Sequence, residues 1–301
     1  MADRRAAVLG HPIAHSLSPV LHRAAYAALG LDGWRYDAVD VTEDDLAAFV
    51  GSLDASWAGL SLTMPLKQAI LPLLDHVEPQ AEVLGVVNTV LVHGQGAGRQ
   101  LTGANTDVHG IVAALAEAGV MASGSDGHPV RRAVVLGAGA TAASALAALG
   151  SLGCTNPLVL ARSMARAGST MRAAHRMGLD AEFRVLDERS VVEVLHEAEV
   201  VLSTLPPRAA DGIADALRAS ASGEVGPGAG IGAARPVHGV VLDCAYDPRP
   251  TALVAAWQEA GGVAVTGERM LLHQAGEQVR LMTGARPPVE AMAAALAEAL
   301  V

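Results

Sequence analysis

Four short clusters of polar residues occur in the first half of the chain, and each adjoins an apolar segment. They are His11–Pro19, Gly59–Lys67, Gly85–Thr89 and Gly103–Asp107. In the first cluster, Ser16 and Ser18 offer two hydroxyl donors at the start of a predicted helix. The positive end of the helix dipole also lies there, so the two hydroxyls suit a bound carboxylate. Ser18 is equally well explained as the N-cap of that helix.

Two of these clusters end in a charged residue whose role the pattern leaves open. Lys67 lies in the first turn of a predicted helix, where the dipole disfavours a cation, and this placement hints at a role other than structure. A single lysine is nonetheless usually a solvated side chain. Asn105, Thr106 and Asp107 are likewise explained by a helix cap followed by a favourable first-turn acid.

A glycine-rich turn in the middle of the chain has the form G-x-G-x-x-A, with an apolar strand pattern before it and a helix pattern after it. Its residues are Gly137, Ala138, Gly139, Ala140, Thr141 and Ala142. This is a form of the dinucleotide fingerprint, in which Gly137 permits the tight turn and Gly139 lets the backbone approach a pyrophosphate. Ala142 lets the helix pack close to the strand, and the helix N-terminus offers free N–H groups to the phosphates. The alternative is an ordinary tight turn between a strand and a helix.

The end of the next predicted strand indicates which dinucleotide the turn would bind. The sequence there is Leu160, Ala161, Arg162, Ser163, Met164, Ala165 and Arg166. An NAD site has Asp or Glu at this point for the ribose 2′-hydroxyl, whereas an arginine accommodates the 2′-phosphate of NADP. No acid is present, and Arg162 and Arg166 have the spacing that lets them face one way on a helical turn. NADP is therefore the expected cofactor, with a solvated basic turn as the alternative.

Apolar runs alternate with helical patterns for most of the chain, which predicts an α/β fold with largely parallel sheets. Strands are expected at 6–9, 34–40, 58–62, 86–92, 133–136, 158–160, 200–203 and 240–243. Helices are expected at 19–29, 43–50, 65–74, 107–118, 141–152 and from residue 268 onward, with a break at 284–288. We interpret 121–130 as a linker or surface turn and the Gly/Ala/Pro-rich stretch 221–238 as a mobile surface insertion.

The composition disfavours several classes of function. The chain has 301 residues, of which 51% are apolar and 3% aromatic, so two domains with cores of Ala, Val and Leu are expected. Its net charge of −10 without basic blocks makes it a poor partner for nucleic acid or anionic membranes. Cys154 and Cys244 are too few for a disulfide framework and lack metal-ligand spacing, so we expect a cytoplasmic protein without a metal. We see neither a signal peptide nor an apolar run long enough for a membrane span.

Taken together and in order, the motifs resemble those of the shikimate dehydrogenase family. The family's pattern is G-x-P-I-x-H-S-x-S-P, N-V-T-x-P-x-K, G-A-x-N-T and N-T-D-x-x-G, followed by the glycine fingerprint and G-x-x-M-L-x-x-Q-A. The last motif occurs here as Gly267–Ala275, and the resemblance runs from about Val8 to Thr283. Ser61 and Leu62 replace the Asn and Val of the second motif, and Val87 replaces a small residue of the third.

The resemblance implies a role for each matched residue. Lys67 and Asp107 match the paired catalytic residues beside the hydroxyl that is oxidised. Ser16 and Ser18 match the hydroxyls that hold the substrate carboxylate, and Tyr246 matches a tyrosine near that carboxylate. Hydrogen bonds to the ring substituents are implied for Thr63, Asn88 and Gln274. Cofactor contacts are implied for the six residues of the glycine turn and for Ala161, Arg162, Ser163, Arg166, Gly267 and Met270.

The resemblance also implies the reaction and the order of domains. The reaction is the reversible, NADP-dependent reduction of 3-dehydroshikimate to shikimate, a step of aromatic amino-acid (chorismate) biosynthesis. A substrate domain is expected at 1–107, completed by C-terminal helices at 268–301, and a Rossmann-type NADP domain at 108–267, with the site in a cleft between them.

Particular residues argue against two alternatives to this function. A quinate or dual quinate/shikimate dehydrogenase of the same fold would often prefer NAD, and Arg162 argues against it. A catalytically silent NADP-binding regulatory protein is disfavoured by the joint presence of Lys67, Asp107 and Gln274. The sequence leaves open whether the protein forms a homodimer.

Overall fold

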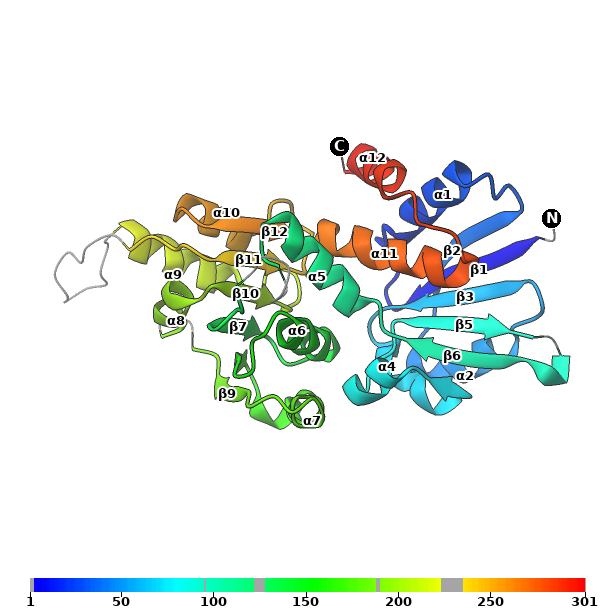
Figure 1. Ribbon diagram of the computed structural model, residues 1–301, viewed down its shortest axis with the longest axis horizontal. Coiled ribbons are helices and arrows are strands. Elements are labelled where there is room, and N and C mark those ends of the chain that lie inside the picture. Colours follow the sequence, from blue (N-terminus) through cyan, green and yellow to red (C-terminus); the bar gives the residue numbers. More distant parts are fainter. Residues whose placement is uncertain (1–2, 95, 122–127, 188–189, 223–234, 301) are drawn as a thin grey trace. The chain divides into compact units, whose positions relative to one another are not determined.

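The computed structural model describes residues 3–94, 96–121, 128–187, 190–222 and 235–300. The chain divides into two compact units, each built on a six-stranded sheet. Unit 1 contains Met1–Gly110 and Leu271–Val301, and unit 2 contains Ile111–Met270. Figure 1 labels most helices and strands of both units. The predicted α/β class is confirmed.

The sheet of unit 1 is mixed, where the sequence predicts a largely parallel one. Its order is β2-β1-β3-β5-β6-β4. The strands are β1 Arg4–Gly10, β2 Trp34–Asp40, β3 Trp57–Leu62, β4 His76–Val77, β5 Thr89–His93 and β6 Gln100–Ala104. β1 pairs in parallel with β2 and β3, whereas β5 runs antiparallel to β3 and β6. The connection from β5 to β6 spans only residues 94–99, and so short a link suits an antiparallel pair.

The two faces of this sheet carry different side chains because successive residues of a strand point to opposite sides. The helices are α1 Ser18–Ala28, α2 Glu43–Gly51, α3 Leu66–Ala69, α4 Pro79–Leu84, α5 Asp107–Glu117, α11 Gly267–Thr283 and α12 Val289–Ala299. Leu60 and Leu62 of β3 belong to a buried apolar cluster with Leu46 of α2 and Leu66 of α3. Ser61 lies between those leucines in the sequence and instead hydrogen-bonds to a residue of α11. One face of this sheet therefore packs against an apolar cluster, and the other carries a buried polar contact.

The strands of unit 2 form a wholly parallel sheet in the order β12-β11-β10-β7-β8-β9. They are β7 Ala133–Leu136, β8 Leu158–Ala161, β9 Glu182–Val185, β10 Val200–Ser203, β11 Val240–Asp243 and β12 Val263–Thr266. The helices between them are α6 Ala140–Ser151, α7 Gly168–Arg176, α8 Val191–Glu197, α9 Asp211–Ser222 and α10 Ala252–Glu259. This is the Rossmann strand order, and the order reverses between β7 and β10, where such folds bind dinucleotides.

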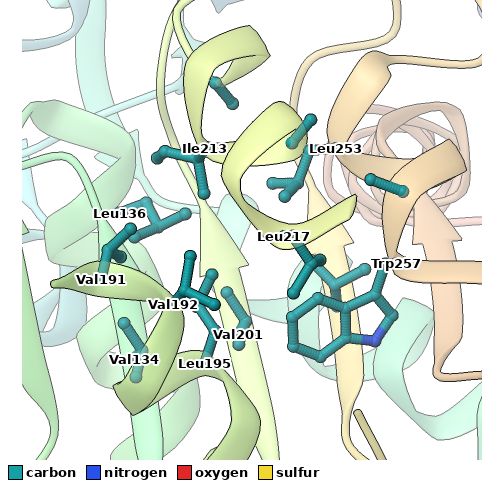
Figure 2. Close-up of a cluster of buried hydrophobic side chains, with 14 of the residues drawn as sticks. Val134, Leu136, Val191, Val192, Leu195, Val201, Ile213, Leu217, Leu253 and Trp257 are labelled. Atoms are coloured by element: carbon teal, nitrogen blue, oxygen red, sulfur yellow. The ribbon is translucent and has the colours of Figure 1, made fainter. Parts of the chain in front are cut away.

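Apolar side chains from three helices pack on one face of this sheet. Figure 2 shows Val134 and Leu136 of β7 and Val201 of β10 beneath residues of α8, α9 and α10. Trp257 of α10 is fully buried in this cluster, and its indole Nε1 donates to the Gly239 carbonyl at 3.0 Å. The polar atom of the largest buried side chain is thus satisfied, so its burial carries no hydrogen-bond cost.

Several predicted elements differ from the structure. The helix expected at 65–74 is a four-residue helix, α3, followed by a 3₁₀ turn at Leu71–Leu73. Pro72 interrupts the run because it has no N–H to donate. The strand expected at 86–92 begins only at Thr89, which leaves Asn88 before it. Ser18 is the first residue of α1 and not its N-cap, a position that Leu17 occupies without a side-chain bond.

Parts of two predicted loops fall outside the described residues. These are 122–127 of the predicted linker and 223–234 of the predicted insertion. Among the helices that the structure describes, none combines the length and the apolar character needed to cross a membrane.

Candidate active site

Lys67 and Asp107 form an ion pair inside unit 1. The Lys67 ammonium Nζ lies 2.5 Å from Asp107 Oδ2. The Asp107 side chain is 1% exposed and that of Lys67 is 14% exposed, so the lysine is the more accessible partner. The two residues are 40 positions apart in the sequence. Lys67 is therefore no solvated surface lysine, which was the simpler interpretation of its motif.

Asn88 fixes the other oxygen of Asp107. Its amide Nδ2 lies 2.8 Å from Asp107 Oδ1 and 2.8 Å from Gln274 Oε1. Its amide oxygen accepts from the Thr106 backbone N–H at 2.8 Å and from the Thr89 hydroxyl at 2.8 Å. With donors on its oxygen and acceptors on its nitrogen, the Asn88 amide has one satisfied orientation. Both Asp107 oxygens thus have a fixed donor.

Irregular backbone at the ends of strands brings these residues together. Asn88 precedes β5, and its backbone N–H donates to the Ala104 carbonyl at the end of β6. Asn105 follows β6, and its side chain accepts from the Val108 N–H, which caps α5 and places Asp107 in the first turn. The Val87 N–H donates to the Lys67 carbonyl and so holds the lysine segment against the same edge. The predicted cap at Asn105 therefore positions Asp107.

The other predicted substrate residues of unit 1 lie in different surroundings. Gln274 of α11 is half-buried and contacts Asn88 directly. Thr63 is half-buried after β3, and its methyl group packs so close to Gly10 that a larger residue there would collide with it. Ser16 is half-buried, and its hydroxyl accepts from the Ser18 N–H at 3.4 Å. The structure brings Lys67, Asn88, Asp107 and Gln274 together by direct contacts.

A buried polar cluster beneath the site was missed in the sequence. It consists of His22, Tyr36, Ser61, Thr89 and Gln278. His22 stacks on Tyr36 with ring centroids 3.9 Å apart, and its Nε2 lies 3.2 Å from Gln278 Oε1. Burial lowers the pKa of His22 to about 3, so the ring is neutral and donates through Nε2. Burial likewise raises the pKa of Tyr36 far above its usual range, so its hydroxyl keeps its proton.

One compositional signal in the sequence singles out Lys67. Lys67 is the only lysine in the sequence, and the other 20 of its 21 lysine and arginine residues are arginines. The single lysine of this arginine-rich chain is thus the residue that pairs with Asp107. An ammonium group can give up a proton near neutral pH far more readily than a guanidinium.

In unit 2, the glycine turn leaves the N-terminus of α6 open. Gly137 has φ +103°, and a Cβ there would lie 2.6 Å from the Thr204 hydroxyl, so glycine is required. Gly139 has no heavy atom within 4 Å of the place its Cβ would take, and no side chain caps α6. The Thr170 hydroxyl, which the sequence did not single out, donates to the Ala138 carbonyl at 2.8 Å. The turn therefore offers space and backbone N–H groups that fit a pyrophosphate.

The predicted 2′-phosphate residues follow β8 in unit 2. Arg162 and Arg166 are exposed, Ser163 is half-buried and Ala161 is buried at the end of the strand. A 3₁₀ turn at Met164–Arg166 follows, so the two arginines are not on one α-helical turn as their spacing suggested. Within the described part of the chain, neither arginine takes part in an ion pair. Two uncompensated guanidinium groups at this position fit a phosphate.

The remaining predicted residues lie in the second half of unit 2. Tyr246 is half-buried after β11, and burial together with the nearby Glu268 charge raises its pKa. Gly267 begins α11, and a Cβ there would collide with the Cys244 carbonyl. Met270 is 6% exposed. Among the described residues, no group of three or more His, Cys, Asp or Glu could hold a metal ion.

Two family models match parts of the chain. The model described as shikimate dehydrogenase substrate binding domain matches residues 8–90. The model described as shikimate 5'-dehydrogenase C-terminal domain matches residues 267–297. These segments contain Ser16, Ser18, Lys67 and Asn88 in the first case and Gln274 in the second.

Comparison with whole proteins covers nearly the entire chain. The chain is 39% identical over 300 residues to a protein of Citrifermentans bemidjiense named shikimate dehydrogenase (NADP(+)), covering 98% of this chain and 95% of that one. A crystal structure of Mycobacterium tuberculosis shikimate dehydrogenase matches with TM-score 0.80 and 37% identity, covering 98% and 99%. That of the Thermus thermophilus enzyme in complex with NADP(H) and shikimate matches with TM-score 0.74 and 32% identity, covering 99% and 100%.

A quinate dehydrogenase of Corynebacterium glutamicum in complex with NAD also matches, with TM-score 0.78 and 26% identity, covering 99% of this chain and 100% of that one. The fold is therefore shared by enzymes with different names, and the fold alone does not choose between their substrates. The identities of 39% and 37% over almost the full length lie with the shikimate dehydrogenases. The chain belongs to the shikimate dehydrogenase family.

Proposed function

We propose that this protein catalyses the reversible, NADP(H)-dependent interconversion of 3-dehydroshikimate and shikimate. The observation that carries the proposal is the buried Lys67–Asp107 pair, 2.5 Å apart and oriented by Asn88. The names of the relatives and the structure bound to NADP(H) and shikimate support the same reaction. The expected pathway is aromatic amino-acid biosynthesis, and we place the protein in the cytoplasm.

Bound NADP(H) supplies or accepts the hydride at the ring carbon. The protein must then move a proton to or from the oxygen on that carbon. Asp107 is almost fully buried and both of its oxygens already accept from donors, whereas Lys67 keeps part of its surface accessible. The geometry therefore favours Lys67 as the group that touches the substrate oxygen, with Asp107 stabilising its charge and holding its position.

We assign the other predicted residues of unit 1 to substrate binding. Ser16 and Ser18, at the start of α1, offer hydroxyl donors to the carboxylate, and the dipole of α1 adds positive potential there. Gln274 and Asn88 share a hydrogen bond, and Asn88 also donates to Asp107, which suits contacts of the two amides to ring hydroxyls. Thr63 completes this set, and Tyr246 of unit 2 is assigned to the carboxylate. Unit 1 is accordingly the proposed substrate domain.

We assign NADP binding to unit 2. The open N-terminus of α6 would hold the pyrophosphate through backbone N–H groups of Gly139, Ala140 and Thr141. Arg162, Ser163 and Arg166 would hold the 2′-phosphate, with Arg162 nearest the end of β8. Gly267 and Met270 are assigned to the nicotinamide.

A steady-state assay with shikimate and quinate, each with NADP⁺ and NAD⁺, tests this function. We expect the highest kcat/KM for shikimate with NADP⁺. A higher value for quinate with NAD⁺ would identify the first alternative instead. Binding of NADP⁺ without turnover of either acid would identify the silent regulatory protein. Light scattering on the same sample tests whether the protein is a homodimer.

A further inference from the structure

Gln278 lies one helical turn after Gln274 on α11 and is buried, with 2% exposure. Its amide oxygen accepts from the Ser61 hydroxyl at 2.8 Å. Ser61 in turn accepts from the Tyr36 hydroxyl at 2.6 Å, and the Ser18 side chain also hydrogen-bonds to Tyr36. On its oxygen side, Gln278 is therefore linked to the end of the site where Ser18 lies.

The amide nitrogen of Gln278 points toward the catalytic pair. It donates to the Thr89 hydroxyl at 3.1 Å and to the Asn88 carbonyl at 3.4 Å. The Thr89 hydroxyl donates to Asn88 Oδ1, and Asn88 Nδ2 donates to Asp107 Oδ1, each at 2.8 Å. One chain of hydrogen bonds thus runs from Tyr36 through Gln278 to Asp107.

The direction of this chain depends on the orientation of the Gln278 amide. Because its NH₂ group donates to Thr89, the only proton of that hydroxyl is free to point at Asn88. If the amide were turned over, its oxygen would face Thr89 and attract that proton away from Asn88. Water cannot replace the lost donor, since Ser61, Thr89 and Gln278 are each 3% exposed or less.

We propose that Gln278 is a positioning residue for the reaction. It fixes the Thr89 hydroxyl, which fixes the Asn88 amide, which holds Asp107 in the geometry that Lys67 needs. Gln278 touches neither Lys67 nor Asp107 in any of the described contacts, so it acts through Asn88. Its catalytic effect rests on the proposed function, whereas its effect on Asn88 does not.

The kinetic test compares Gln278→Leu with Val279→Ala, a neighbouring substitution in the same helix. Val279 is fully buried and has no part in the hydrogen-bond chain, so Val279→Ala reports the effect of weakened packing alone. Since small displacements of catalytic groups cost up to about a hundred-fold in rate, we expect Gln278→Leu to lower kcat by about ten-fold or more and to leave the KM for NADP⁺ unchanged. Val279→Ala should lower the melting temperature and keep kcat within about two-fold. Equal kcat losses in both variants would contradict the proposal.

A second, smaller substitution keeps the proposal testable if Gln278→Leu does not fold. Ser61→Ala removes one hydroxyl and should lower kcat by about three- to ten-fold, because it takes away one neutral hydrogen bond that orients the Gln278 amide. The double variant should be little slower than Gln278→Leu, since Ser61 is linked to Asn88 through Gln278. Additive losses of kcat would show that the two residues act independently and would contradict the proposed chain of hydrogen bonds.

Hydrogen exchange of the Asn88 side-chain amide tests the positioning without any turnover. Its NMR signals are assigned by their loss in Asn88→Asp. We expect slow exchange in the wild type and in Val279→Ala, and exchange at least about ten-fold faster in Gln278→Leu. An unchanged rate in Gln278→Leu would overturn the proposal even in an active enzyme. A wild type inactive on shikimate would refute the proposed function and leave this measurement decisive for Gln278.

Discussion

Replacing Lys67 by alanine is the most direct test of the site, because two interpretations of this residue predict different results. As a solvated surface lysine it would contribute no more than about 0.5 kcal/mol to stability and nothing to activity. In the structure it pairs at 2.5 Å with Asp107, which is 1% exposed. The substitution therefore leaves a buried carboxylate without its cation and removes the group that we propose moves the proton.

The size of each effect follows from this geometry. Removing one partner of a fully buried ion pair costs about 3–5 kcal/mol of stability. The cost here should be lower, about 1–3 kcal/mol, because Lys67 is 14% exposed, Asn88 still donates to Asp107, and water can enter the space that the lysine leaves. Positioned proton transfer contributes about 10²–10⁴ in rate, or about 2.7–5.4 kcal/mol of the barrier, so kcat should fall by that factor.

The assay measures kcat and KM for shikimate with NADP⁺, alongside urea unfolding and NADP⁺ binding. Binding of NADP⁺ should survive, since the glycine turn and Arg162 belong to unit 2. Arg280→Ala, which breaks a partly exposed pair with Glu277 on α11, serves as the control and should keep its kcat. A Lys67→Ala protein with wild-type kcat on shikimate would refute the assignment of this pair.

Lys67→Arg separates proton exchange from simple charge. Arginine keeps the cation beside Asp107 but cannot release its proton near neutral pH. If Lys67 exchanges the proton, kcat should fall about as far as in Lys67→Ala, while most of the lost stability returns. Recovery of kcat in Lys67→Arg would instead assign the exchange to Asp107. Asp107→Asn should also lower kcat, and the double variant should be little worse than either single one.

Three further predictions concern the cofactor, the carboxylate and the buried histidine. Arg162→Ala should raise the KM for NADP⁺ by about ten- to a hundred-fold and leave NAD⁺ use nearly unchanged, as loss of a charge-assisted contact of about 1.5–3 kcal/mol requires; equal losses with both cofactors would contradict it. Ser16→Ala should raise the KM for shikimate without unfolding the protein, and unchanged KM and kcat would rule out its contact with the carboxylate. His22 has a folded-state pKa of about 3 against 6.5 for the free side chain, so below pH 6.5 only the unfolded chain takes up its proton. Its contribution to stability should therefore fall by about 1.4 kcal/mol per pH unit from pH 6.5 down to about 3, and urea unfolding at pH 7 and pH 5 should show a smaller difference in His22→Phe than in the wild type.

The sequence predicts the parts of the fold that local patterns determine. The glycine turn and the strands around it follow from spacing, because a Rossmann unit uses the same short-range pattern for its turn, helix and core. The elements not predicted include β4, with two residues, α4, with six, and β6, which contains Gly103, a residue type that strands disfavour. The strand expected at 86–92 exists as β5, but its antiparallel direction was not predicted, since the direction of a strand depends on its partner and not on its own residues.

The Lys67–Asp107 pair illustrates what a linear pattern leaves undetermined. Lys67 and Asp107 each have an ordinary local explanation, and only the fold brings residues 40 positions apart to 2.5 Å. The buried polar cluster is harder still to predict, because Ser61 and Gln278 are 217 positions apart and belong to a strand and a helix that no local pattern brings together. A serine in a strand and a glutamine in a helix carry no functional signal alone, since most such residues face solvent.

The buried polar cluster would lose stability if any one of its members were missing, because its partner would be left buried without a hydrogen bond. Five polar side chains are buried there, and burying an unpaired hydroxyl or amide costs about 1–3 kcal/mol. An apolar core at the same place would avoid this cost, and the opposite face of β3 has one, built on Leu60 and Leu62. The polar face is therefore not explained by stability. It is explained by the directed hydrogen bonds that reach Asn88, because an apolar core could not choose between the two orientations of that amide.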